Sequence, residues 1–267
     1  MSKAPILSDK YYDEPTVFQP GNLLREARRQ KNIPECPVPR ICLLDPDGDV
    51  VRYLKETGEA RQHECWACYH SEMYETTVND QSIGIIPCAV GAPYAVLVAE
   101  QLFASGCEQL ISVTSAGVIS DEPLTRRFGL ITESLRDEGT SYHYLPAEQS
   151  AVLPAHLRRA LYPDGDRQAP YTEITSWTTD APYRETQPAI DEKKKQGITS
   201  VEMEASALYA YAAYTGNDIA CFAHLTNTMA QEKGDFEKGE HFGSKVTLEL
   251  IAYVIDRLVS DQESIDR

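Results

Sequence analysis

The order of apolar segments predicts an α/β fold, a single domain with a mixed, mostly parallel central sheet flanked by helices. Short apolar runs of strand length alternate with longer segments whose apolar residues recur at helical spacing. Several runs are apolar throughout, which is typical of strands that are covered on both faces. The 267 residues are enough for one large core, so no second domain is required.

Residues 1–40 are rich in proline, asparagine and charge and predict an N-terminal arm with one helix near Leu23 to Gln30. The α/β domain then spans residues 41–267. Its expected strands are Ile41–Leu44, Ile83–Val90, Leu110–Val113, Leu130–Glu133 and Ile219–Leu225. Apolar stripes predict helices around Ala95 to Phe103 and Val246 to Leu258, and the charged run Asp191–Lys195 predicts a solvated helix face. In such folds, ligands bind beyond the carboxyl ends of the strands.

The composition excludes several classes of partner. With 41 acidic and 25 basic side chains, the formal charge is -16, so nucleic acid and anionic membranes are poor partners. We find neither a leader segment nor a membrane span and expect a cytoplasmic protein. The seven cysteines include Cys42, Cys88, Cys107 and Cys221 inside apolar runs, which indicates reduced thiols and no disulfide framework.

Five short polar segments follow the predicted strands: Val90–Pro93, Thr114–Gly117, Arg136–Tyr144, Trp177–Glu185 and Glu202–Glu204. Each has an ordinary structural explanation when taken alone, such as a turn, a structural histidine, a core tryptophan or a solvated helix start. Each also carries groups suited to a ligand, since small turn residues expose backbone N–H groups and aromatic rings stack on heterocycles.

The most informative of the five is Glu202-Met203-Glu204, which precedes the apolar stretch Leu208 to Tyr214. A carboxylate has two acceptor oxygens and therefore matches the adjacent hydroxyls of a ribose. Helix N-termini also tolerate buried negative charge. A sugar diol is the partner that this motif indicates.

In this order, the five segments resemble the nucleoside phosphorylase family, which includes uridine phosphorylases, bacterial purine nucleoside phosphorylases and nucleosidases. The resemblance spans roughly Ile41 to Val259 and is strongest to a bacterial, uridine-phosphorylase-like branch. It implies cleavage of the N-glycosidic bond of a nucleoside in salvage metabolism, nominally by phosphorolysis to free base and ribose 1-phosphate. It also implies no cofactor, no metal and a homo-oligomer, a dimer or hexamer, with the arm as a candidate subunit contact.

The resemblance assigns roles to individual residues. The ribose would contact Glu202, Met203, Glu204 and Ser115. The base would contact Asp180, Tyr183, Arg184 and Asn227. Phosphate or water would lie near Gly91, Thr114, Ser115 and Gly117. The chemical step would depend on Asn227, Glu204 and His143.

Asn227 bears on which base is cleaved. It falls where adenosine-cleaving relatives carry an aspartic acid that protonates the purine. An amide can hydrogen-bond the departing base but cannot deliver a proton to it. Pyrimidines or 6-oxopurines are therefore expected rather than adenine.

The phosphate site departs from the family pattern. Asp45 falls at a conserved turn glycine, and three expected arginines are replaced by Asp49, Ser112 and Tyr69. Carboxylates repel a dianion at short range. Either phosphate is held by other groups, for which Arg52, Arg126 and His143 are the candidates, or water is the nucleophile. A third reading is a nucleoside-binding module that has lost turnover.

The cluster His63-Glu64-Cys65-Trp66-Ala67-Cys68-Tyr69-His70 raises the alternative of a zinc site. All of its candidate ligands lie within eight residues, whereas structural zinc sites usually pair two distant halves. We therefore expect no metal there, and a thioredoxin-like role for Cys65 and Cys68 is weaker still.

Overall fold

Strands and helices alternate along this computed structural model, which describes residues 4–121, 125–163, 168–227 and 237–265. The helices are α1 (Pro20–Lys31), α2 (Asp49–Thr57), α3 (Ala92–Ala104), α4 (Ala155–Leu161), α5 (Gln187–Lys195), α6 (Ala205–Thr215) and α7 (Ser244–Ile265). The strands are β1 (Ile41–Asp45), β2 (Arg61–Gln62), β3 (Tyr74–Val78), β4 (Gln81–Pro87), β5 (Gln109–Val118), β6 (Phe128–Asp137), β7 (Ala151–Val152), β8 (Tyr171–Thr179), β9 (Ser200–Glu202) and β10 (Asp218–Asn227). Short 3-10 turns are η1 (Pro5–Leu7), η2 (Ser141–His143), η3 (Pro182–Arg184) and η4 (Glu240–Gly243).

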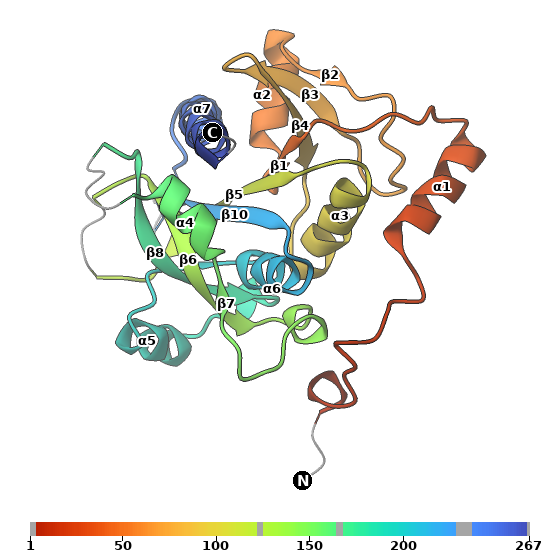
Figure 1. Ribbon diagram of the computed structural model, residues 1–267. Helices are drawn as coiled ribbons and strands as arrows, with labels where there is room; N and C mark the ends of the chain where they lie inside the picture. The colour runs from red at the N-terminus through yellow and green to blue at the C-terminus, as the bar shows by residue number, and fades with distance from the viewer. Residues whose placement is uncertain (1–3, 122–124, 164–167, 228–236, 266–267) are drawn as a thin grey trace.

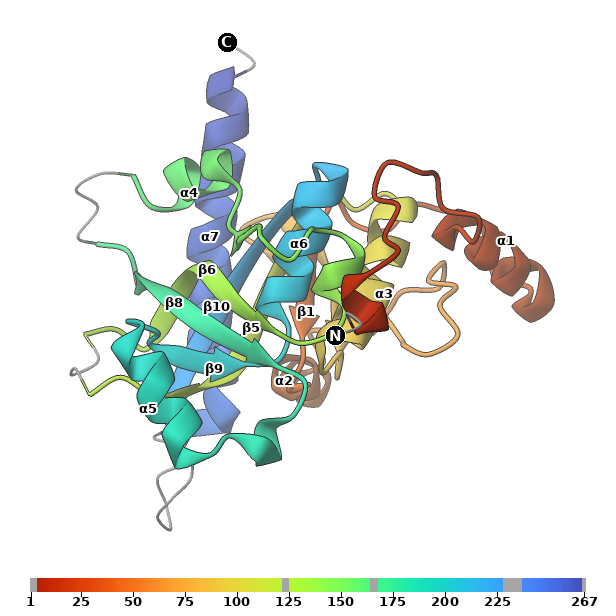
Figure 2. The same ribbon diagram turned by 90° about the horizontal axis from the view of Figure 1, so that it is seen from below.

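One mixed sheet runs through the described parts of the chain in the order β10-β6-β8-β9-β5-β1-β4-β3-β2, and β10 also pairs with β5. The strands β5, β10, β6, β8 and β9 therefore close into a ring (Figure 2). Strands β1, β4, β3 and β2 extend the sheet beyond this ring (Figure 1). The closure depends on β5, which pairs with β10 from Gln109 to Gly117. It also pairs with β1 from Gln109 to Ser112 and with β9 at Gly117 and Val118. The α/β class with a mixed, helix-flanked sheet is confirmed, whereas the closure is a feature that the sequence did not predict.

Helices cover both sides of the sheet. Figure 1 shows α3 and α6 packed together on one side, and α2 and α7 on the other. Helix α6 is buried around its whole circumference from Ala205 to Ala212, which explains why its sequence shows no polar face. In the described residues, no helix has both the length and the apolar character needed to cross a membrane.

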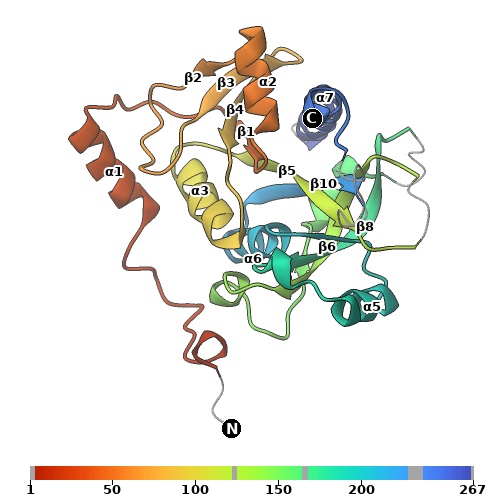
Figure 3. The same cartoon turned by 180° about the vertical axis from the view of Figure 1, so that it is seen from behind.

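Helix α1 packs outside this body. Leu24 and Ala27 of α1 form a small apolar cluster with Ala67, and Lys31 Nζ donates to the carbonyl of Cys68 at 3.0 Å. Figure 3 shows the segment that connects η1 to α1 on the outside of the molecule. The helix predicted in the arm is thus present.

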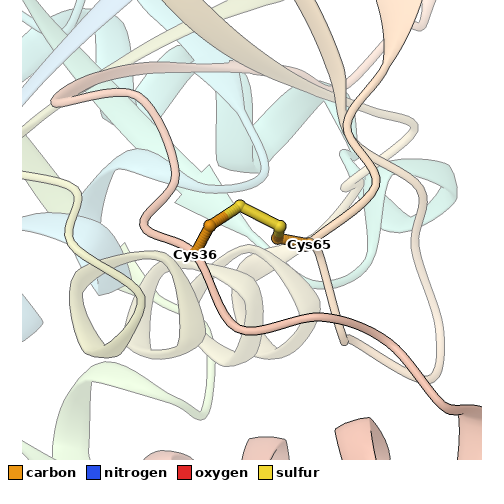
Figure 4. The surroundings of a disulfide bond; sticks show 2 residues. All are labelled: Cys36 and Cys65. Atoms are coloured by element: carbon orange, nitrogen blue, oxygen red, sulfur yellow. A yellow bond between two sulfur atoms is a disulfide. The ribbon is translucent and has the colours of Figure 1, made fainter.

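The structure overturns the expectation that all cysteines are reduced. Cys36, which follows α1, forms a disulfide with Cys65 (Figure 4). Cys42, Cys107 and Cys221 are buried free thiols, as their apolar surroundings predicted, but Cys88 is exposed on a residue with a φ of 59°. Because the two bonded cysteines are 29 residues apart, no local pattern pointed to their pairing.

Reducing the disulfide is expected to lower the free energy of unfolding by about 3 to 4 kcal/mol, the loop-entropy value for a loop of this length. The Cys36→Ser variant should show the same loss in urea unfolding, and a reductant should not lower its stability further. Cys88→Ser is the control, because that thiol is free and exposed. Equal urea midpoints for the wild type and Cys36→Ser would contradict a stabilising role of the disulfide.

Candidate functional site

The carboxyl ends of four parallel strands meet at one edge of the sheet. Strands β4, β1, β5 and β10 lie side by side in this order, and each neighbouring pair is parallel. Gly91 begins α3 soon after β4, Thr114 and Ser115 lie on β5, and β10 ends at Asn227 beside Gly117. This edge is where an α/β sheet places its ligands. The side chain of Asn227 lies outside the described part of the structure.

Glu204 is brought to this edge by the start of α6. Its side chain is buried, and Oε1 accepts the N–H of Gly91 at 2.7 Å. Gly91 has a φ of 87°, a conformation that favours glycine. Oε2 is also buried, and among the described residues it has no hydrogen-bond partner. A buried carboxylate oxygen without a donor is costly, so this atom is suited to a ligand that brings a hydroxyl.

The surroundings of Glu204 favour its neutral form. Burial, followed by the charge of Glu202, raises the pKa of Glu204 to about 8, against the opposing effects of the Gly91 N–H and the Thr114 hydroxyl. Asp47 adds a smaller repulsion. Hydroxyl donors from a bound sugar would stabilise the ionised carboxylate.

This raised pKa predicts a loss of stability in alkali. The unfolded chain binds fewer protons than the folded chain between the ordinary pKa of Glu204, 4.5, and about 8, so the free energy of unfolding falls as pH rises through that range. Urea unfolding from pH 6.5 to 8.5 is expected to show a decrease of about 2 to 4 kcal/mol. Glu204→Gln should flatten most of this slope. Asp45 and Glu185, whose pKa values burial raises to about 7, account for the remainder. A slope that is unchanged in Glu204→Gln would contradict the burial of a titrating carboxyl there.

Ser115 faces an internal carboxylate. Its N–H and its hydroxyl both donate to Oδ2 of Asp47, at 3.1 and 2.6 Å. Lys238 Nζ lies 3.2 Å from the same oxygen and 2.8 Å from Oδ2 of Asp49. The donors that were expected to hold phosphate or water thus already hold Asp47, with one cation beside it.

A tight turn places Asp47 in this position. Asp45 ends β1, buried, and its Oδ2 accepts the N–H of Val51 at the start of α2. Gly48 has a φ of 72°, and a Cβ there would lie 2.7 Å from Cys88 Sγ, so only glycine fits. Sequence reasoning considered Asp45 and Asp49 but missed Asp47 and Lys238. The glycine two residues after a proline was the signal of a turn at the end of the strand.

In the described residues, we find no hydrogen bond or ion pair between the arginines named from the sequence and Asp47 or Ser115. Arg52 pairs with Asp49 at 2.6 Å, and Arg126 is exposed. Ser112, at an expected arginine position, has a buried hydroxyl oxygen without a partner. Tyr69, at another, donates to Gln30 of α1.

Glu202 and Met203 also lie at the start of α6. Met203 is half-buried, whereas Glu202 is buried and its carboxylate is hydrogen-bonded entirely within the protein. Glu202 therefore caps the helix, a task that the sequence did not reveal, and we do not assign it a ribose contact.

Asp180, predicted on the base side, and His143, predicted for the chemical step, lie in a different place. Asp180 and His143 line a cavity of about 480 Å³ between the arm and α3. Asp180 accepts the N–H of Gly139, and His143 Nδ1 lies 3.0 Å from Lys10 Nζ; burial and Lys10 lower the pKa of His143. Tyr183 is fully exposed and Arg184 is exposed. In the described chain, no hydrogen bond or ion pair that we find joins these four residues to Glu204.

Comparisons with known proteins bear on the family and the fold of this chain. Residues 40–259 match the sequence model of the Phosphorylase superfamily. Uridine phosphorylase of Thermococcus kodakarensis is 25% identical over 76% of this chain and 82% of its own length. Uncharacterized protein R802 of Acanthamoeba polyphaga mimivirus is 27% identical over 61% of this chain, which spans 62% of that relative's length. A crystal structure of uridine phosphorylase from Vibrio fischeri, complexed with 6-hydroxy-1-naphthoic acid, superposes with a TM-score of 0.68 at 20% identity, covering 84% of this chain and 92% of that one.

Proposed function

Because this chain belongs to the Phosphorylase superfamily, we propose that it cleaves the N-glycosidic bond of a nucleoside or a related ribosyl compound. The observation that carries the proposal is the free Oε2 of Glu204, buried where α3, β5 and α6 meet. A ribose diol can donate to this oxygen, and Met203 can pack on the sugar. The groups around it include the Gly91 N–H and the Thr114 hydroxyl, with Ser115 next along β5, three of the residues that the sequence named.

The chemistry follows from where charge develops. In glycoside cleavage, positive charge spreads over C1' and the ring oxygen while the electron pair of the C–N bond moves to the base. An ionised Glu204 that binds the diol lies on the sugar side, where its negative charge stabilises the positive charge of the transition state. Asn227, as the proposed partner of the base, can donate a hydrogen bond to it but no proton. Pyrimidines and 6-oxopurines are the proposed substrates.

The contacts of Ser115 favour water as the nucleophile. Asp47 takes both Ser115 donors, so a phosphate would have to displace a carboxylate from the same place. Asp45 and Asp49 lie on the same turn and repel a dianion further. In hydrolysis, a water oxygen bonds to C1', its proton passes to Asp47, and the base leaves with the electrons of the C–N bond.

Phosphorolysis is the second candidate. Lys238, 3.2 Å from Asp47, is a cation at the expected phosphate site. If Asp47 turned away, Lys238 and the two Ser115 donors would face phosphate together. Relatives named as uridine and guanosine phosphorylases belong with this alternative.

The test is an assay of base release. Uridine, inosine, guanosine and adenosine are each incubated with the full chain in phosphate-free buffer and in phosphate, and both products are quantified by chromatography. Free ribose at equal rates in both buffers supports hydrolysis, and ribose 1-phosphate formed only with phosphate supports phosphorolysis. Calorimetric binding of a nucleoside without any base release would instead support the binding module.

A further inference from the structure

Glu202 is the last residue of β9, three residues before the first residue of α6, and its carboxylate oxygens accept hydrogen bonds from the protein. Its Oε2 accepts the N–H groups of Glu204 and Ala205, both at 2.7 Å. Its Oε1 accepts the hydroxyl of Thr178 at 2.5 Å, with the hydroxyls of Ser176 and Ser134 at 3.3 and 3.4 Å. The side chain is 4% exposed. A bound sugar would find no free acceptor there.

Because of these bonds, the side chain of Glu204 is not needed to cap the N-terminus of α6. Glu204 is the N-cap of α6, where an acidic side chain usually accepts N–H groups of the first turn. It makes no such bond. The N–H of Ala205 is taken by Glu202, and the N–H of Ser206 donates to Thr178 at 2.9 Å. Because the helix start is satisfied from β8 and β9, the Glu204 carboxylate can turn away from α6 toward Gly91.

We propose that Glu202 is a positioning residue: it fixes the backbone of Glu204 and releases the Glu204 carboxylate to face the ribose, without touching the substrate itself. The role of Glu204 toward the ribose rests on the proposed function. The hydrogen bonds by which Glu202 fixes the Glu204 backbone are present without a ligand. Glu202 thus acts on the substrate only through Glu204.

The charge of Glu202 gives this arrangement a measurable signature. The groups that face Glu204 are Glu202 from β9, Asp47 from the turn after β1, the Gly91 N–H from α3 and the Thr114 hydroxyl from β5. Burial raises the pKa of Glu202, and the donors around its carboxylate oppose that rise by favouring the ionised form. The charge of the ionised Glu202 helps to raise the pKa of Glu204. A glutamine at position 202 keeps the shape and removes the charge.

The experiment compares Glu202→Gln with Glu138→Gln. Glu138 is a matched buried carboxylate, 5% exposed, that accepts the N–H groups of Thr140 and Ser141 and the hydroxyl of Ser206. Side-chain carboxyl NMR follows the titration of Glu204 without substrate, with Glu204→Gln used for assignment. We expect the Glu204 midpoint to fall by about one pH unit in Glu202→Gln, as expected for loss of a neighbouring like charge, and to stay unchanged in Glu138→Gln.

Kinetics provide the second readout. The acidic limb of the kcat/KM profile should move to lower pH in Glu202→Gln by the same amount, whereas Glu138→Gln should only lose thermal stability. An unmoved Glu204 midpoint in a folded Glu202→Gln protein would overturn the positioning role. If the wild type cleaves no nucleoside, the proposed function fails while the NMR titration still decides this inference.

Discussion

Replacing Glu204 by Gln is expected to lower kcat/KM for nucleoside cleavage by about 10²- to 10³-fold, the loss typical of a group that acts on transition-state charge. The amide keeps the shape of the side chain, including an oxygen for the Gly91 N–H. It removes the negative charge that stabilises the positively charged sugar in the transition state. Its NH2 group also meets the sugar hydroxyls as a donor where an acceptor is needed. Base release measured at saturating and limiting nucleoside gives kcat and kcat/KM separately.

The fold should survive this change, because the raised pKa of Glu204 already makes its neutral form the favoured one near pH 7. Circular dichroism and thermal unfolding check that point. Glu138→Gln is the control for loss of a buried carboxylate away from the free Oε2. Cleavage within a fewfold of wild type by Glu204→Gln would remove the enzymatic interpretation of this site.

Replacing Asp47 by Ser is expected to reduce phosphate-independent cleavage by at least about 10²-fold, the lower range for removing a general base. The change also frees the Ser115 N–H and hydroxyl and leaves Lys238 beside them. We therefore expect the residual activity to increase with added phosphate and to yield ribose 1-phosphate. Rates measured from zero to high phosphate at constant ionic strength test this.

Asp49→Asn is the matched control for Asp47→Ser. It removes one carboxylate from the same turn and breaks a contact to Lys238, but Asp49 does not bond to Ser115. Its cleavage should stay independent of phosphate. Full hydrolytic activity in Asp47→Ser would show that another group activates water, and full activity of wild type only with phosphate would favour the second candidate.

Much of the architecture could be read from apolar spacing. The runs beginning at Ile41, Leu110 and Ile219 became β1, β5 and β10, because each is buried on both faces. Strand β8 (Tyr171–Thr179) was missed, since its threonines and serines resemble a loop although most of them are buried. Ring closure could not be predicted either, because it arises from which strands share β5 and not from any local pattern.

The site could be located but not resolved in detail. Gly91, Thr114, Ser115 and Glu204 were named and do converge, because strand ends and a helix start fix their backbones. Side-chain direction was beyond the sequence. Nothing in Glu202-Met203-Glu204 says which carboxylate turns inward to cap the helix and which one faces the pocket.

The missed residue Asp47 illustrates the same limit. Its carboxylate reaches Ser115 across 68 positions of sequence because Gly48 turns the chain sharply after β1. Residue types compared position by position carry no sign of a carboxylate that bonds to donors on a distant strand. Only the contact itself shows which group meets those donors.

The pairing of strand β5 leaves one edge open at Thr114 and Ser115. On one side both residues pair with β10. On the other side the pairing with β1 ends at Ser112, and the pairing with β9 begins only at Gly117. A backbone N–H on that side of this interval has no neighbouring strand among the described residues to bond to, and Ser115 donates its own to Asp47 instead.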